Sequence, residues 1–422
     1  MGCVLAGLLG TLAACSSSDG GTPVLTWYTN PDAGGQARMA ADCTEAADGR
    51  YRIVTSPLPR DAASQREQLA RRLAARDSSI DIISLDPPFL PEMAQAGFLA
   101  PVPEDKVETF SQDVLEGALA GATWDGTLAA VPFWANTQVL WYRKSVAEEA
   151  GLDLEEDDVT WDELIEAARA QDLLLAVQGA KAESLTVWVN ALVASAGGQV
   201  IDDPTATSDE LKVSLDTDAG RAAAEIIGTI GREGLGGPGL PTADENASLS
   251  LFQGDRGAFM VNWPFVWSAT SGAVEDGAVT REVLDDIGWA MYPRVDDEHE
   301  AAPPLGGINL AVGAFGKHPD LAYEALECIV TPENQTAYFV SDGNPPASST
   351  AYDSDEVDEA FPMADLIRDS IEQAAPRPQT PFYNEVSIGL QESWHPASSV
   401  SERTPARSAE RIMSVLRGES LL

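Results

Sequence analysis

Basic residues are scarce in this 422-residue chain, where 26 Lys and Arg stand against 67 Asp and Glu for a formal net charge of −41. Nucleic-acid binding depends on Lys and Arg that neutralise phosphates, so this balance argues strongly against a nucleic-acid partner. It also disfavours an anionic small ligand, although a single buried arginine can override the overall field. The simplest interpretation of the acidity is solubility.

Histidine and cysteine are also rare, and neither occurs at a metal-ligand spacing. The three histidines are scattered along the chain, at His299, His318 and His395. Cys3 and Cys15 lie near the N-terminus, whereas Cys43 and Cys328 fall in predicted helices of the body. Without a Cys-x-x-Cys pair or a Cys/His cluster, we expect no metal site and no cofactor. In an exported protein Cys43 and Cys328 can form a disulfide, and two separate buried thiols are the alternative.

Long apolar runs and phosphate-binding motifs are missing as well. The apolar run at residues 1–15 is too short to span a membrane as a stable helix. The glycine-rich segment 231–239 contains neither G-x-G-x-x-G nor a Walker lysine, so we expect no phosphate site there. The chain is nevertheless long enough for two or three hydrophobic cores, since single cores stop growing near ~250–300 residues.

Strands and helices alternate at the start of the body. The predicted order is strand 24–30, helix 36–45, strand 51–55, helix 62–76 and strand 81–86. This rhythm predicts a mostly parallel sheet with helices on both faces. Asn30 and Asp86 end the first and third strands. Asp86 is compatible with two roles, as a cap of the following helix or as an acceptor for ligand hydroxyls.

The most informative stretch covers residues 251–267. Gly254 and Gly257 bracket a tight turn between a helix and a short apolar strand at 258–261. Pro264 suits the first position of the next helix. The junction therefore presents an amide and two aromatic rings: Asn262, Trp263 and Phe265. Ligands of α/β proteins bind at the carboxyl ends of strands, and aromatic faces beside fixed amides suit a sugar ring.

Three further segments are candidates for a site between two lobes. Asn136 and Gln138 lie within an otherwise apolar run, where amides need partners. They contact either a ligand or the backbone of a strand that crosses between lobes. Gly306 and Gly307 precede another plausible crossing strand. Arg377, between two prolines, is either a rigidly mounted hydrogen-bonding fork or a surface residue of a Pro-rich loop.

Together these segments resemble the extracellular solute-binding proteins of carbohydrate ABC importers. The resemblance rests on a lipobox-like Leu-Ala-Ala-Cys ending at Cys15, and on residues 24–28, 81–86, 126–132, 252–260 and 306–309. It is strongest toward the actinobacterial trehalose-binding lipoproteins, through residues 136–143, 261–266, 306–312 and 377–378. The Phe-x-Gly-x-x-Gly-Ala-Phe-Met segment at residues 252–260 is fairly specific to this family.

The resemblance implies an α/β, two-lobed periplasmic-binding-protein-like fold with a hinge and an interlobe ligand cleft. It divides the chain into a signal peptide (1–14), a flexible tether (15–23), lobe 1 (24–134 and 308–344) and lobe 2 (135–307 and 345–422). Contacts to the disaccharide would come from Asp86, Asn136, Glu245, Trp263 and Arg377. To these the residue pattern adds Asn30, Gln138, Asn262, Phe265 and Gly307. The resemblance also implies a Cys43–Cys328 disulfide.

The expected protein is a non-enzymatic, monomeric binding subunit outside the cytoplasm, held at the cell membrane by a lipid on Cys15. Its partners would be the sugar and the permease and ATPase subunits of an ABC importer. A rival ligand is another di- or oligosaccharide, such as a maltose-type glucan. A distant alternative is an exported glycosidase, which needs two carboxylates roughly 5–9.5 Å apart. A surface adhesin or sensor that binds sugar without feeding a permease is the third.

Overall fold

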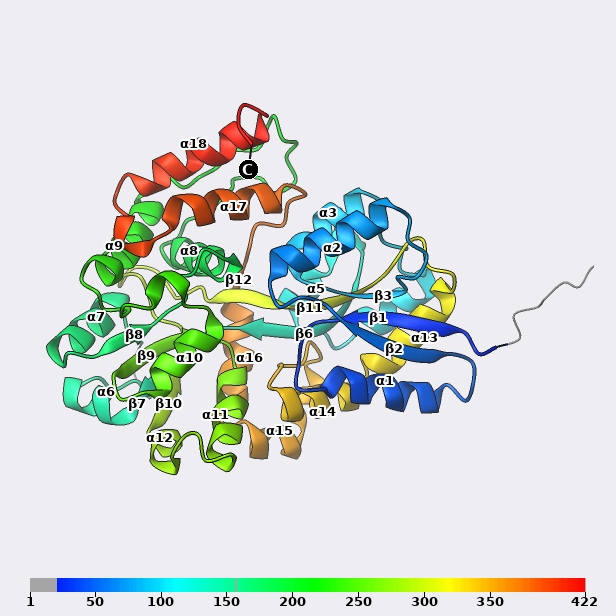
Figure 1. Ribbon diagram of the computed structural model, residues 1–422, viewed down its shortest axis with the longest axis horizontal. Helices are drawn as coiled ribbons and strands as arrows, with labels where there is room; N and C mark the ends of the chain where they lie inside the picture. The colour runs from blue at the N-terminus through cyan, green and yellow to red at the C-terminus, as the bar shows by residue number, and fades with distance from the viewer. Residues whose placement is uncertain (1–20, 156–157, 422) are drawn as a thin grey trace, which may run out of the picture.

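A computed structural model describes residues 21–155 and 158–421, which form two α/β lobes lying side by side (Figure 1). The predicted signal peptide and Cys15 lie outside the described residues. The sheet of lobe 1 has the order β12-β11-β3-β1-β2, with β6 also paired to β11. Its strands are β1 (Val24–Thr29), β2 (Arg52–Pro57), β3 (Ile82–Leu85), β6 (Val131–Thr137), β11 (Pro304–Val312) and β12 (Ala375–Pro376).

The first three strands of lobe 1 are parallel, as the alternation of strands and helices predicts. The sheet as a whole is mixed, however, because β11 runs antiparallel to both β3 and β6. This strand enters from the second lobe and so meets the parallel set from the opposite direction. The helices of this part are α1 (Gly35–Ala46), α2 (Ala62–Ala74), α3 (Leu90–Gln95), α4 (Val107–Ser111), α5 (Glu116–Gly121), α13 (Pro319–Ile329) and α14 (Pro332–Asp342), beside a hairpin of β4 (Thr123–Trp124) and β5 (Thr127–Leu128).

Lobe 2 contains a second sheet with the order β10-β7-β9-β8. Its strands are β7 (Val139–Arg143), β8 (Leu174–Ala176), β9 (Gly257–Asn262) and β10 (Ile287–Ala290). Its helices are α6 (Lys144–Ala150), α7 (Trp161–Ala170), α8 (Glu183–Ser195), α9 (Asp218–Arg232), α10 (Glu245–Gln253), α11 (Phe265–Glu275) and α12 (Arg281–Asp285). The strand, turn and helix predicted around residues 251–267 are confirmed as the end of α10, β9 and α11.

The C-terminal helices complete both halves of the molecule. They are α15 (Asp355–Ala360), α16 (Ala364–Gln373), α17 (Tyr383–Trp394) and α18 (Thr404–Leu416). Figure 1 shows α17 and α18 lying beside α8 and α9 at the outer end of lobe 2. Arg377 follows β12 directly, so it lies where the chain leaves the lobe 1 sheet and enters α17.

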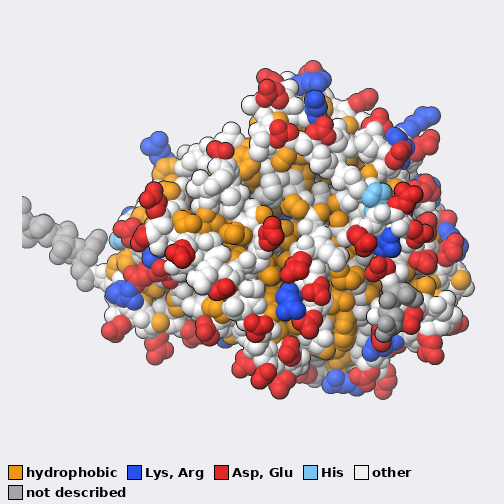
Figure 2. All heavy atoms as spheres, turned by 180° about the vertical axis from the view of Figure 1, so that it is seen from behind, with side chains coloured by type: hydrophobic (Ala, Val, Ile, Leu, Met, Phe, Trp, Pro, Cys, Tyr) orange, Lys and Arg blue, Asp and Glu red, His pale blue; other side chains and the backbone are white. Residues whose placement is uncertain are grey.

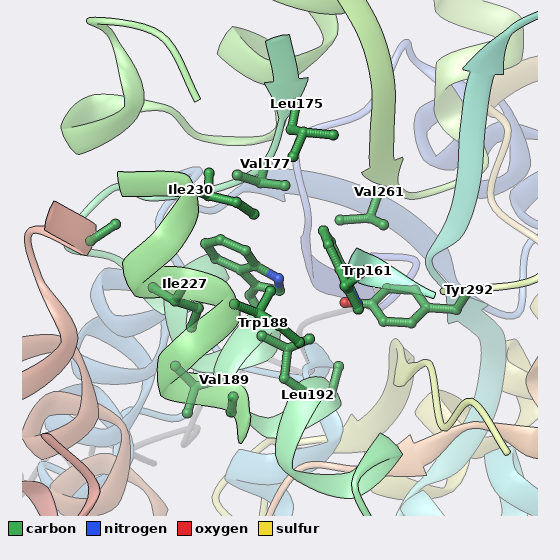
Figure 3. Packing of buried hydrophobic residues seen from close by; sticks show 14 of the residues in the cluster. Trp161, Leu175, Val177, Trp188, Val189, Leu192, Ile227, Ile230, Val261 and Tyr292 are labelled. Carbon is green, nitrogen blue, oxygen red and sulfur yellow. The ribbon is translucent and has the colours of Figure 1, made fainter. Parts of the chain in front are cut away.

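Apolar clusters cover both faces of each sheet. In the core of lobe 2, the ring of Trp161 packs against Trp188 and Tyr292, at centroid distances of 6.0 Å (Figure 3). A separate cluster contains Ala135 of β6 and Val139 of β7 together with residues of α14 and α16. Because this cluster includes residues from both sheets, the two lobes share apolar packing beneath the strands that connect them.

Two chain crossings connect the sheets at adjacent positions. Gln138 alone separates β6 from β7, and β11 pairs with β6 through Gly306 opposite Asn136 and Gly307 opposite Ala135. Gly307 has φ +117°, and a Cβ at this position would overlap the backbone carbonyl oxygen of the facing strand. Glycine is therefore required at this position of the crossing strand.

A disulfide joins Cys43 of α1 to Cys328 of α13, with a Cα–Cα distance of 5.9 Å. The pairing implied by the resemblance is thus present. It links the first helix of lobe 1 to the segment that returns from lobe 2.

The surface is strongly acidic, and in Figure 2 Asp and Glu side chains are spread over the face shown, with fewer Lys and Arg among them. None of the described helices is long and apolar enough to cross a membrane.

Candidate ligand-binding site

A cleft of about 710 Å³ is lined by residues of both lobes. This volume falls within the range of small-molecule pockets, ~300–1,000 Å³. Eight of the ten predicted contact residues contribute to its lining: Asn30, Asp86, Asn136, Glu245, Trp263, Phe265, Gly307 and Arg377. They come from strand ends and helix starts far apart in the chain, and the fold brings them to one hollow.

The other two predicted residues, Gln138 and Asn262, are fully buried and do not line the cleft. The Gln138 amide donates to Oε1 of Gln178 at 3.3 Å. The Asn262 amide donates to the backbone oxygen of Glu245 at 3.0 Å, and its Oδ1 accepts from the backbone N–H of Trp263 at 2.9 Å. Both residues lie beneath the site, where Gln138 bonds to Gln178 and Asn262 ties Trp263 to the start of α10.

Arg377 is deeply enclosed, with only 4% of its side chain exposed. Its Nη1 donates to Oδ2 of Asp86 at 3.1 Å and to Oε1 of Glu183 at 2.8 Å, and its Nη2 donates to Oδ1 of Asp86 at 2.5 Å. Asp86 follows β3 in lobe 1, whereas Glu183 begins α8 in lobe 2. The guanidinium therefore joins the two lobes: it makes a two-bond fork with Asp86 of lobe 1 and a single ion pair with Glu183 of lobe 2.

Electrostatics keep this arginine charged. Burial alone would lower the pKa of Arg377, but the carboxylates of Asp86 and Glu183 raise it well above its usual range. For Glu183 burial dominates and raises the pKa, against the opposing effects of Arg377 and of hydroxyl donors from α17. The arrangement contains two carboxylates and one cation, so its net charge is negative when both acids are ionised.

Glu183 is the main site residue that sequence reasoning missed. In sequence it is one of many acids at a helix start, where the helix dipole favours a negative charge whatever the function. Its partners Tyr383 and Ser387 lie about two hundred positions later, so no local pattern reports them. The sequence signal in this part of the site is Arg377, flanked by prolines and near aromatic residues, and it points to a ligand contact and not to Glu183.

Trp263 supplies an aromatic face that rests on the crossing strand. A Cβ at Gly306 would lie 2.9 Å from Cη2 and Cζ3 of the Trp263 indole, which shows how closely the ring covers this glycine. Glu245 lies beside it at the start of α10. Burial raises the pKa of Glu245, while its own backbone N–H and the side chain of Trp263 oppose the shift. Trp134 and Phe265 add two further rings to the lining.

Acidic groups dominate the rest of the cleft. The lining contains seven carboxylates, from Asp32, Asp61, Asp86, Glu183, Asp244, Glu245 and Asp342, and two arginines, Arg60 and Arg377. Amides lie among them, from Asn30, Gln65, Asn136, Asn246 and Asn344. Over the described parts of the chain, no group of three or more His, Cys, Asp or Glu has a geometry that could hold a metal ion. The cleft is thus rich in hydrogen-bond acceptors and poor in positive charge.

Residues 49–336 match the model of a family described as bacterial extracellular solute-binding protein. The chain belongs to this family. The architecture agrees: the maltose-bound MalE3 of T. maritima superposes with a TM-score of 0.79 at 24% identity, covering 94% of this chain and 100% of the other. The predicted two-lobed binding-protein fold is confirmed.

Two curated relatives extend the comparison. This solute-binding protein is 25% identical over 400 residues to a probable ABC transporter-binding protein of Deinococcus radiodurans, covering 89% of each chain. It is 26% identical over 305 residues to a maltotriose-binding protein of Pyrococcus abyssi, covering 71% of this chain and 61% of the relative. The family and these relatives support binding without catalysis, as the sequence predicts.

Proposed function

We propose that this solute-binding protein is the lipid-anchored substrate-binding subunit of an ABC sugar importer. In this role it binds a disaccharide and delivers it to the permease, and the first candidate is trehalose. The observation that carries the proposal is the convergence of Trp263, Asp86, Asn136 and Glu245 on one interlobe cleft. In this role Cys15 carries the lipid, the protein acts as a monomer outside the cytoplasm, and hinge bending closes the lobes over the ligand.

The chemistry of the cleft favours a neutral polyol ring. An indole face offers apolar contact to the C–H face of a pyranose, while carboxylates and amides accept and donate to hydroxyls at its edge. Charge-assisted hydrogen bonds of this kind are worth roughly 1.5–3 kcal/mol each. Seven acids against two arginines disfavour phosphorylated or carboxylated sugars, because an anion would meet uncompensated negative charge.

Trehalose is preferred on the resemblance of residues 136–143, 261–266 and 306–312 to the actinobacterial trehalose-binding lipoproteins. A maltose-type glucan is the second candidate. It is favoured by the maltotriose-binding relative and by the superposition on a maltose-bound protein. Both ligands present glucose-type rings, so the aromatic face and the acceptors would serve either.

A thermal-shift screen with trehalose, maltose, maltotriose and a sugar phosphate tests the proposal. A ligand that binds only the native state raises the melting temperature by mass action. We expect a rise with trehalose, a smaller or no rise with the maltose series, and none with the phosphate. A rise with the phosphate alone would contradict the proposal, and release of glucose from trehalose during incubation would indicate a glycosidase instead.

Anchoring and delivery are tested separately from ligand choice. In cells producing the full chain, we expect the protein in the membrane fraction and a Cys15→Ala variant outside it. Loss of trehalose uptake on deletion of the protein would distinguish an importer subunit from a sensor or adhesin. Normal uptake after deletion would remove the importer role while leaving sugar binding intact.

A further inference from the structure

Glu183 lies at the meeting point of the cleft wall and the helices behind it. It occupies the first turn of α8, and 11% of its side chain is exposed. Oε1 accepts from Arg377 at 2.8 Å and from the Tyr383 hydroxyl, and Oε2 accepts from Ser387 Oγ at 2.6 Å. Both carboxylate oxygens are therefore engaged: Oε1 with Arg377 and with Tyr383 of α17, and Oε2 with Ser387 of α17.

The supporting donors form a row on one face of α17. Tyr383, Ser387 and Gln391 follow each other at four-residue intervals, which places them on the same side of a helix. The Gln391 amide donates to Ser387 Oγ at 2.9 Å, and Ser387 in turn donates to Glu183. Burial and the neighbouring carboxylate of Glu183 raise the pKa of Tyr383 well above its usual range, so its hydroxyl stays a donor. This row fixes the carboxylate before any ligand arrives.

Arg377 depends on that carboxylate for its orientation. The flanking prolines restrict its backbone but leave its side-chain torsions free. Without Glu183 the fork to Asp86 of lobe 1 would be the only restraint on the guanidinium, and the conformational entropy of the long side chain would favour leaving that fork. With Glu183 present, Arg377 is held from both sides and the free conformations of a long, flexible side chain are removed before binding.

We propose that Glu183 is a positioning residue of the ligand site, whose ionised carboxylate fixes the Arg377 guanidinium against Asp86 and thereby sets ligand affinity. This inference rests on the proposed sugar-binding function and deepens it. Glu183 lines the cleft beside Arg377 and Asp86, through which it acts, and is supported by Tyr383 and Ser387 of α17, which lie outside the lining. Figure 1 shows α8 and α17 beside each other in lobe 2, next to the β12 segment that leads to Arg377.

The role predicts a proton-linked affinity. The charged or titratable groups that face Glu183 are Arg377, Tyr383, Asp86 and Glu245. Burial raises the pKa of Glu183, so its ionised form is lost at a higher pH than an ordinary glutamate requires. Protonation would remove the ion pair to Arg377, and ligand affinity would fall on acidification. Because burial also raises the pKa of Glu245, only the part of the pH dependence that disappears in a Glu183 variant belongs to Glu183.

Calorimetric titration of the full chain with trehalose compares wild type with Glu183→Gln, Glu183→Asp and a control. The control is Glu392→Gln, an acid of the same lobe that pairs with Arg411 at 2.8 Å outside the cleft. At neutral pH we expect Glu183→Gln to weaken binding about 10- to 100-fold, in line with the loss of a charge-assisted hydrogen bond. Glu183→Asp retains the charge and should fall between Glu183→Gln and wild type, and Glu392→Gln should match wild type.

The pH profile separates positioning from simple structural support. Wild-type affinity should weaken on acidification, and Glu183→Gln should show a flatter profile. A Glu183→Gln variant with wild-type affinity, or with the wild-type pH profile, would overturn the proposal.

A second arm needs no ligand. In a crystal structure of unliganded Glu183→Gln, we expect Arg377 to have left its forked contact with Asp86. A retained fork would overturn the positioning role even if no disaccharide binds wild type. In that case the titration would count against the proposed sugar, while the crystal structure would still decide the function of Glu183.

Discussion

A single methyl group added at Gly306 should weaken ligand binding by displacing Trp263. The Cβ of Gly306→Ala would lie 2.9 Å from Cη2 and Cζ3 of the indole, closer than carbon atoms pack. Restoring an ordinary separation of about 3.5–4.0 Å moves the far edge of the ring by about 0.6–1.1 Å. The backbone of Gly306 tolerates alanine because its φ is not positive, so β11 should keep its pairing to β6.

The size of the effect follows from the stacking contact. Aromatic contacts contribute about 0.5–1.5 kcal/mol beyond the area they bury. Losing most of this stacking energy should raise Kd about 2- to 12-fold, because each 1.4 kcal/mol of binding free energy corresponds to a factor of ten in Kd. Trp263 itself remains in the chain, so the variant tests the position of the ring and not its presence.

Gly272→Ala provides a matched control. Gly272 lies inside α11, and nothing lies within 4 Å of the position its Cβ would take. Alanine in a helix interior is favoured over glycine by about 0.5–1 kcal/mol, so this variant should be slightly more stable with an unchanged Kd. Calorimetry gives the two Kd values and thermal unfolding gives the stabilities. Equal Kd values for Gly306→Ala and wild type would refute the assignment of Trp263 as the stacking face.

Three further predictions concern stability. Gly307→Ala should lower the free energy of unfolding by about 1–3 kcal/mol in denaturant titration, because φ is +117° at this residue; an unchanged midpoint would contradict it. Replacing Cys43 and Cys328 together by alanine should lower the free energy of unfolding by about 2–5 kcal/mol, since the disulfide spans 285 residues. Reduction of the wild-type protein should lower it by a similar amount. Hydrogen bonds from Ser79 lower the pKa of Asp77 from 3.8 to about 2. Ionised Asp77 therefore stabilises the folded state above pH 3.8, and this stabilisation is lost as the pH falls to about 2. Asp77→Asn should therefore melt below wild type near neutral pH and together with it at about pH 2.

Local sequence patterns predicted the junction at the centre of the site. Gly254, Gly257 and Pro264 mark a turn, a strand and a helix start, and each signal depends only on neighbouring backbone geometry. The same holds for the parallel strands that carry Asn30 and Asp86 to the cleft. Such features are encoded within about ten residues, and the structure reproduces them.

Which of the predicted polar residues line the cleft depends on burial, which local sequence patterns do not report. Gln138 and Asn262 carry the same kind of polar side chain as Asn136, but Gln138 between β6 and β7 and Asn262 at the end of β9 are buried beneath the cleft. Glu183 resembles any acid at a helix start until α17, two hundred residues later, encloses it. Arg377 was expected as a ligand contact, and the structure adds that its guanidinium already pairs with two carboxylates. These outcomes depend on tertiary contacts between distant segments, which carry no local signature.

Titration of trehalose into wild type and into Trp263→Ala, followed by calorimetry at neutral pH, tests the central claim most directly. The account predicts saturable one-to-one binding to wild type and a severe loss of affinity in a variant that still melts cooperatively. Equal binding to both proteins would show that the sugar does not rest on this indole, and the interlobe cleft would lose its assignment as the disaccharide site.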